Sequence, residues 1–80
     1  MSKADEMLKE CKFNQIEDNE HYTIYTSEFF NTKRQIKFWK KDKIFYNDLI
    51  RNNETISSFF IDIKLLQAIN EKCRELEWIE

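Results

Sequence analysis

The stretch "IKFWKKDKIFY", residues 36–46, holds four aromatic residues and four lysines in eleven positions. Two apolar runs flank a polar group, residues 40–43, whose composition is typical of a turn. The pattern predicts two antiparallel strands, residues 35–39 and 44–48, joined by this turn. Such a hairpin can be a plain part of a sheet. It can also belong to a groove for single-stranded nucleic acid, because it interleaves aromatic and basic side chains.

Successive residues of a strand point to opposite faces, and this alternation divides the hairpin into two sets of side chains. Ile36, Phe38 and Ile44 are expected to lie in a core. Lys37 and Trp39 are then expected to face away from that core.

The length of the turn decides on which face Phe45 lies. A three-residue turn pairs position 39 with position 45 and places Phe45 beside Trp39. A turn of two or four residues pairs position 39 with position 44 instead. Glycine is absent from the whole chain, so no turn residue favours one of these registers.

Further strands are predicted on the N-terminal side of the hairpin. Residues 21–26, "HYTIYT", and the shorter run 13–16 have the β-branched and aromatic composition of strands. Residues 17–20 and 31–33 are expected to form turns, and residues 51–54 to form a loop.

A helix is predicted at each end of the chain. Ser2 is a suitable N-cap for the first helix, which should end near Cys11 or Lys12. Asp62 can cap the second helix, from residue 63 to about residue 78. The buried stripe of this second helix is expected to comprise Leu65, Leu66, Ile69, Cys73 and Leu76.

The order of these elements predicts an α+β fold. We expect a small antiparallel meander of three to four strands, with the N-terminal and C-terminal helices packed on one face. Residues 1–80 should form a single α-β-β-β(-β)-α domain, because eighty residues build only one small core. The other face of the sheet would then be left uncovered.

The two ends of the chain resemble those of a family of small phage and prophage proteins from low-GC Gram-positive bacteria. The similarity lies in "ADEMLKECKFNQIEDNE", residues 4–20, and in "IKLLQAINEKCRELEW", residues 63–78, which contains the pattern LQAINxKCxELxW. The function of this family is unassigned, so the resemblance implies a biological setting but no mechanism.

Two positions depart from the pattern of that family. Its members tend to have glycine after each helix, where this chain has Lys12 and Glu77. A non-glycine residue in the left-handed conformation that often ends a helix costs about 1 kcal/mol. Either these two residues accept that strain, or both helices end differently here.

The basic residues are concentrated in the hairpin. Residues 33–43 carry a net charge of +5, whereas residues 1–32 carry −4 and residues 44–80 carry −3. The pI of about 5.5 lies far below the value of about 9 that is typical of phosphate-binding domains. Lysines at turns and edges also protect a sheet against aggregation.

Enzymatic chemistry is not expected. A chain without glycine cannot form a Walker loop, a dinucleotide fingerprint or a nucleophile elbow. The single histidine, His21, belongs to no recognisable catalytic motif. Cys11 and Cys73 are expected to be buried thiols rather than a disulfide or zinc ligands. We therefore expect no enzyme activity, no metal and no cofactor.

No membrane segment is expected either. No apolar run approaches the roughly 20 residues of a membrane span, and the first ten residues lack the apolar stretch of a signal peptide. A cytoplasmic location is the simplest expectation.

The candidate site lies on the face that the helices leave uncovered. Trp39 and Lys37 should lie there with one of Tyr22 or Tyr25, beside the lysines of the turn. The candidate partner-binding residues are Tyr25, Lys37, Trp39, Lys41, Lys43 and Phe45. An exposed aromatic centre with a basic rim suits an acidic protein of the host or phage, or a second copy in a homodimer.

The leading functional hypothesis is a small, non-enzymatic protein–protein interaction module. A phage or prophage accessory protein that inhibits a host or defence protein is its most concrete form. The alternative is a nucleic-acid-binding accessory protein that uses the basic aromatic hairpin, residues 34–46. The acidic remainder of the chain makes this alternative less favoured.

Overall fold

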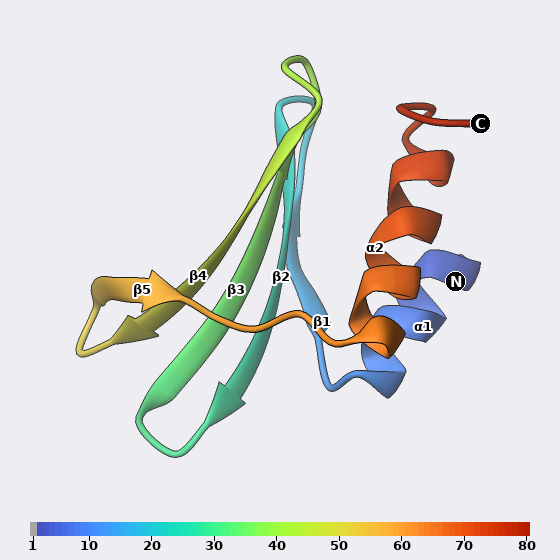
Figure 1. The fold of residues 1–80 in the computed structure, drawn as a ribbon. Helices are drawn as coiled ribbons and strands as arrows, with labels where there is room; N and C mark the ends of the chain where they lie inside the picture. Colours follow the sequence, from blue (N-terminus) through green and yellow to red (C-terminus); the bar gives the residue numbers. More distant parts are fainter. Residues whose placement is uncertain (1) are drawn as a thin grey trace.

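The computed structural model describes residues 2–80 and shows a five-stranded antiparallel sheet with a helix at each end of the chain (Figure 1). The elements are α1 (Lys3–Glu10), β1 (Asn14–Asp18), β2 (Tyr22–Phe29), β3 (Thr32–Trp39), β4 (Ile44–Arg51), β5 (Glu54–Ser58) and α2 (Ile63–Glu75). The strands lie in sequence order, so the sheet is a meander. The predicted α+β fold is confirmed, with one strand more than expected.

Both helices lie on the same side of the sheet, and the other side is uncovered (Figure 1). The sheet twists so that β4 and β5 lie away from the helices, whereas β1 and β2 lie close to them. The molecule measures 36 × 24 × 21 Å along its principal axes. Within residues 2–80, neither helix is long and apolar enough to cross a membrane.

The core fills the space between the helices and the first three strands. Side chains of β2 and β3 meet those of the two helices there, and the edge strands β1 and β5 contribute no buried residue. The buried core comprises Leu8, Phe13, Tyr25, Ile36, Phe38, Leu65, Ala68, Ile69 and Cys73. Ile36 and Phe38 therefore face the helices, as the alternation of the hairpin predicted.

Both predicted helix N-caps are present. The Ser2 side chain accepts a hydrogen bond from the backbone N–H of Asp5 at 3.0 Å, and that of Asp62 accepts one from Leu65 at 2.8 Å. Each bond satisfies a backbone donor that the first turn of a helix leaves without a partner.

Both helices end in the left-handed conformation without glycine. Lys12 has φ 72° and Glu77 has φ 63°. The backbone N–H of the next residue then bonds back to the last turn, from Phe13 to the Leu8 carbonyl and from Trp78 to the Cys73 carbonyl. These are Schellman motifs. Of the two alternatives raised by the sequence, the chain adopts the one with the strained residue.

The buried stripe of α2 is rotated relative to the prediction. Leu66 is 42 % exposed, whereas Ala68 and Lys72 are buried beside Leu65 and Ile69. The position of Leu66 in the core was therefore predicted wrongly. Lys72 forms ion pairs with Asp5 of α1 and with Glu75, so its charge is compensated although the side chain is buried.

The turns differ from the predictions in length, and one strand was missed. Only residues 30–31 separate β2 from β3, a shorter and earlier turn than residues 31–33. Residues 52–53 form a two-residue turn inside the predicted loop, and β5 follows it.

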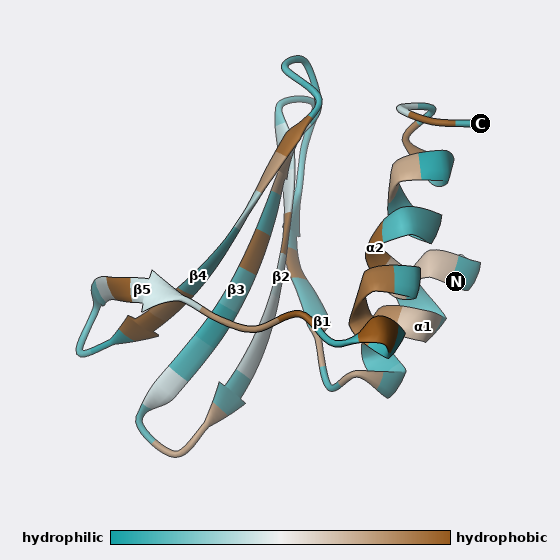
Figure 2. Cartoon of the chain, in the orientation of Figure 1, coloured by the Kyte–Doolittle hydropathy of each residue, from teal (hydrophilic) through white to brown (hydrophobic). Residues whose placement is uncertain are grey.

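The apolar segment between β5 and α2, residues 59–62, crosses the helix-facing side of the sheet (Figure 2). The side-chain amide of Asn47 donates a hydrogen bond to the Phe59 carbonyl at 2.9 Å. The ring of Phe59 stacks on that of Phe13 at 6.0 Å between centroids. These contacts fasten the segment to β4 and to the core.

Candidate functional site

The uncovered face of the sheet carries two rows of side chains that run across the strands. The register places Tyr22, Trp39 and Ile44 in one row, and Ile24, Lys37 and Tyr46 in the next. Ile44 is 41 % exposed and Tyr46 is 51 % exposed. We call these six residues the uncovered face.

An aromatic corner with a lysine above it lies at one end of the uncovered face. The rings of Tyr22 and Trp39 meet edge to face at 5.2 Å between centroids. The Nζ atom of Lys37 lies 4.1 Å from the centroid of each ring, the geometry of a cation–π contact. The Tyr22 hydroxyl donates to Glu17 Oε2 at 2.7 Å, and this hydrogen bond raises the pKa of Tyr22.

Lys40 links the turn of residues 40–43 to the turn of residues 17–20, beside this corner. Its Nζ atom lies 2.8 Å from Asp18 Oδ1 and 2.6 Å from the Asn19 carbonyl. Asn19 in turn accepts hydrogen bonds from the backbone of His21 and Tyr22, and thus makes the Asx turn expected in residues 17–20. Lys40 therefore has a structural partner.

The structure brings four of the six candidate residues to this end of the molecule. Lys37 and Trp39 lie on the uncovered face, and Lys41 and Lys43 are exposed in the adjoining turn. Tyr25 and Phe45 do not lie there, and the two corrections have different causes.

Tyr25 faces the helices and is only 1 % exposed, so its placement on the uncovered face was wrong. Its hydroxyl donates a hydrogen bond to Asp5 Oδ1 of α1, and Lys72 Nζ of α2 lies 3.6 Å from the same oxygen. Burial raises the pKa of Tyr25, and the hydrogen bond to Asp5 adds to this effect. The tyrosine of the uncovered face is Tyr22, since β2 begins there and alternates from it.

Phe45 also faces the helices. The turn has four residues, 40–43, so Trp39 pairs with Ile44 and Phe38 pairs with Phe45. The rings of Phe38 and Phe45 are 5.7 Å apart. Ile44 was expected in the core and lies instead on the uncovered face. The register set by the four-residue turn thus corrects the placements of both Phe45 and Ile44.

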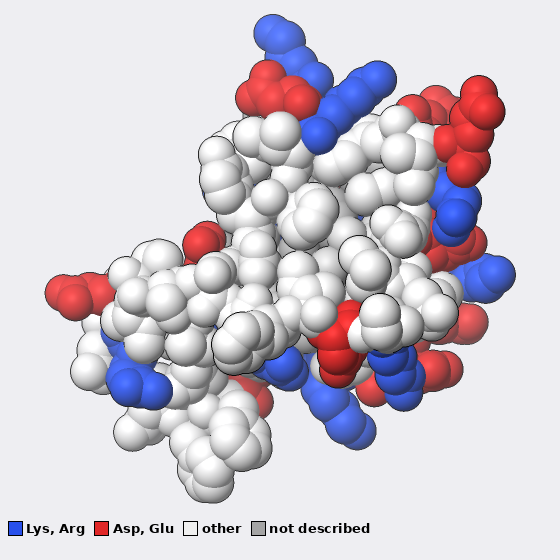
Figure 3. Space-filling view, in the orientation of Figure 1, with Lys and Arg blue, Asp and Glu red and all other residues white. Residues whose placement is uncertain are grey.

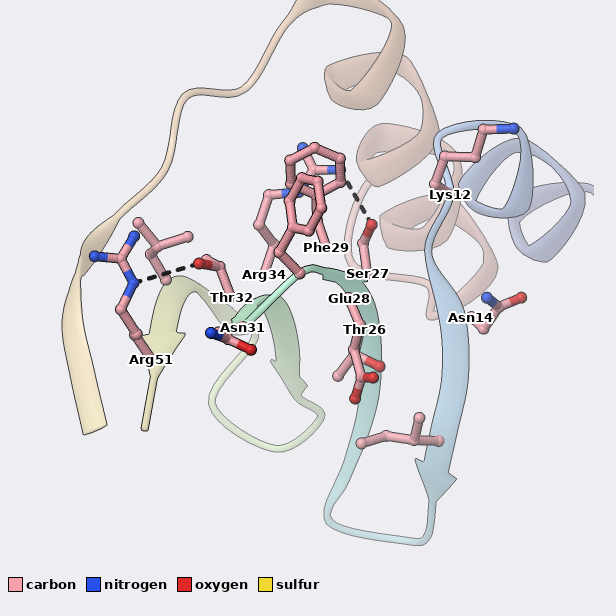
Figure 4. Close-up of a pocket in the computed structure, with 13 residues that line it drawn as sticks. Lys12, Asn14, Thr26, Ser27, Glu28, Phe29, Asn31, Thr32, Arg34 and Arg51 are labelled. Carbon is pink, nitrogen blue, oxygen red and sulfur yellow. Dashed lines mark hydrogen bonds between the residues drawn. The ribbon is translucent and has the colours of Figure 1, made fainter. Parts of the chain in front are cut away.

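A groove at the closed end of the β2–β3 hairpin was not anticipated from the sequence (Figure 4). Phe29 and Phe30 stand beside it, 68 % and 93 % exposed, with their rings 4.6 Å apart. The basic side chains Lys12, Arg34 and Arg51 also line it. We call this the hairpin groove. The two phenylalanines before a turn were the sequence signal for this groove, but such a pair fits the end of an ordinary strand equally well.

A third apolar strip runs along the start of α2. Phe60 is 98 % exposed and Ile63 is 69 % exposed, and Leu66 follows on the same side. Figure 3 shows a broad uncharged area on this side of the molecule, with most charged side chains at its rim.

The two cysteines are not joined to each other. Cys11 and Cys73 are free, and burial raises the pKa of both thiols. Within residues 2–80, no group of three or more histidine, cysteine or acidic residues is placed to hold a metal ion.

Comparison of the chain with family models, curated proteins and solved structures gave no match.

Proposed function

We propose that this protein is a small, non-enzymatic interaction module that binds another protein through the uncovered face. A cytoplasmic accessory protein of a phage or prophage, acting on a host or defence protein, is the setting suggested by the resemblance of its two ends. The groups that would contact the partner are the Tyr22–Trp39 corner with Lys37 and, beside it, Ile44 and Tyr46.

The observation that carries the proposal is a group of apolar and aromatic side chains on adjacent strands, of which Ile44 and Tyr46 are exposed and Trp39 is half-buried. Trp39, Ile44 and Tyr46 lie on two neighbouring rows without any helix over them. Contiguous apolar surface of this kind marks contact sites, and tryptophan and tyrosine are enriched where interfaces contribute most binding energy.

The charges on this side of the sheet favour a protein over a nucleic acid. Alternation places two lysines, Lys33 and Lys37, and three acidic residues, Glu17, Glu28 and Asp48, on the same side. A phosphate backbone needs an excess of cations. The edge-to-face corner with Lys37 against both rings also leaves little free ring surface for a base to stack on.

The same mixture of charges favours a second candidate, self-association. A two-fold dimer brings a patch against its own copy, so a patch that contains both signs can pair with itself. Lys33 and Asp48 lie on neighbouring strands of this side and can provide such pairs.

A photo-crosslinking amino acid at position 46 tests the leading proposal. In a lysate of low-GC Gram-positive cells, we expect a protein adduct that the Trp39→Ala variant loses. The matched control carries the crosslinker at position 67, an exposed site on the outer side of α2. Equal adducts from positions 46 and 67 would contradict the proposal, and an adduct that nuclease removes would favour the nucleic-acid alternative.

A further inference from the structure

The hairpin groove gathers three basic side chains that form no ion pair in the part of the chain that the structure describes. The nearest acidic neighbours are Glu54, which the register sets opposite Arg51, and Glu10 and Asp62, which line a second pocket with Arg34. Lys12, Arg34 and Arg51 line it, and Glu28 is the one acidic residue among its lining side chains. In the part of the chain that the structure describes, no carboxylate lies within 4.0 Å of any of these three cations. The groove is thus complementary to an acidic ligand, although the whole chain carries a net charge of −2.

Arg34 is held in a fixed position within the groove. Its guanidinium lies 4.9 Å from the ring centroid of Phe13 and 5.6 Å from that of Phe59. One nitrogen donates to Ser27 Oγ at 3.1 Å (Figure 4). A guanidinium carries five N–H donors, so a rigidly placed group retains donors for a ligand.

Arg51 lies diagonally across the sheet from Arg34. Arg34 pairs with Leu49 on β4, and Arg51 is two residues further along the same side of that strand. Such diagonal neighbours are about 7–8 Å apart. Carboxylates on alternate residues of an extended chain are separated by about 6.6 Å, since each residue rises about 3.3 Å. The backbone positions of the two arginines are thus spaced like alternate residues of an extended ligand.

Phe29 and Phe30 provide an apolar wall that the fold does not need. Phe30 has φ 56°, a conformation that favours glycine or asparagine in a two-residue hairpin turn. It is 93 % exposed and is absent from the core, so no contact with the core offsets this strain. Strained residues of this kind are found at binding sites.

We propose that the hairpin groove binds an extended acidic segment of a partner protein. Two carboxylates at positions i and i+2 would each accept paired hydrogen bonds from Arg34 and Arg51. A neighbouring apolar side chain would pack on Phe29 and Phe30. This surface does not depend on the uncovered face, because Thr32 and Trp39 are at opposite ends of β3, about 23 Å apart.

Three peptides test the proposal by titration into the ¹⁵N-labelled protein. AEAEFA has the i, i+2 carboxylates, AQAQFA has neutral amides in their place, and AEEAFA has adjacent carboxylates. We expect AEAEFA to shift the backbone amides of residues 27–34 and of Arg51, and to bind about tenfold more tightly than AQAQFA. Equal affinity of AEAEFA and AQAQFA, or shifts centred on Trp39, would overturn the proposal.

Matched variants separate a defined site from general attraction between charges. Arg51→Gln, at an exposed position where the side chain donates one long hydrogen bond of 3.4 Å to Thr32 Oγ1, should weaken AEAEFA about tenfold. Lys41→Gln removes the same charge from the far turn and should leave the affinity unchanged. Equal losses in the two variants would overturn the proposal. Arg34→Gln should match Arg51→Gln, and its amide spectrum shows whether the fold is retained.

Titration with octathymidylate tests whether the groove binds single-stranded nucleic acid instead. We expect it to bind more weakly than AEAEFA, and tighter binding at residues 27–34 would overturn the assignment to a protein segment. Failure of the peptide experiments leaves the photo-crosslinking result at position 46 unaffected, so the two proposals can fail separately.

Discussion

At the scale of single residues, the absence of glycine has a measurable consequence at the helix ends. Lys12 and Glu77 occupy left-handed positions where a Cβ atom crowds the following carbonyl oxygen. The sequence made this strain foreseeable, because a Schellman ending requires such a residue and no glycine is present. The backbone bonds that close the motifs, 2.9 Å at Phe13 and 2.8 Å at Trp78, show that the chain tolerates it.

Replacing either residue by glycine should stabilise the protein. We expect Lys12→Gly and Glu77→Gly each to raise the free energy of unfolding by up to about 1 kcal/mol, because relief of the left-handed strain exceeds the added entropy of the unfolded chain. Urea denaturation measures this change. The control, Gln67→Gly within α2, should lower the stability by about 0.7 kcal/mol. A loss of stability in the first two variants would contradict this account.

The buried Tyr25 should make stability sensitive to alkaline pH. Its pKa is raised in the folded state, so the folded protein keeps the phenol proton above pH about 10, where the unfolded chain releases it. The unfolded state then binds fewer protons, and stability falls as pH rises. Tyr25→Phe should cost about 1–2 kcal/mol at pH 7, because the Asp5 carboxylate loses a hydrogen-bond donor.

The wild type should therefore lose its advantage over Tyr25→Phe above pH about 10, so that the two free energies of unfolding approach each other. Urea denaturation at pH values from 7 to 11 measures both. The control is Tyr46→Phe, which removes an exposed hydroxyl and should change the free energy of unfolding little at pH 7. Parallel curves for Tyr25→Phe and the wild type would refute the role assigned to this tyrosine.

At the scale of elements, strong local signals predicted most of the fold. Ser2 and Asp62 were identified as caps because their side chains can bond the first turn of a helix, and both do so. The strand β5 was missed because all five of its residues are exposed, so no apolar alternation reveals it. Its pairing depends on the turn before it, which the sequence suggested only as a loop.

The turn between β4 and β5 should control the stability of β5. Asn52 has φ 54° and Asn53 has φ 63°, and a two-residue turn with both angles positive matches the twist of the strands. Asn53→Thr places a β-branched residue in this conformation, so we expect faster hydrogen exchange at the β5 amides, with little change in β2 and β3. Asn53→Gly should slow the same amides, and uniform acceleration over the whole sheet would contradict this.

At the scale of the whole molecule, the candidate site could be predicted only in part. Lys37 and Trp39 were placed correctly because alternation along one strand needs no other information. To place Phe45, the length of a turn without glycine had to be known. To place Tyr25, the first residue of β2 had to be known, and only packing against the helices decides it. The hairpin groove is lined by Lys12 and by residues of β1, β2, β3 and β4, and it has no local sequence signature.

The exposed surface of the molecule is larger than its mass requires. Its accessible area is 5746 Å², whereas a monomeric protein of 9.9 kDa has about 5,200 Å². An extended sheet covered on one side only accounts for this excess. The uncovered face is part of this sheet surface, and Ile44 and Tyr46 are exposed there on β4.

Self-association through the uncovered face should therefore be detectable at micromolar concentration. We expect sedimentation equilibrium to give a mass near twice that of the monomer. A standard interface buries about 800 Å² per partner, and each copy offers apolar side chains together with Lys33 and Asp48. Tyr46→Lys should shift the equilibrium to monomer, because it places an unpaired charge where the two copies meet. Gln67→Lys adds the same charge on α2 and should leave the dimer intact, whereas a wild type that sediments as a monomer rules out the dimer.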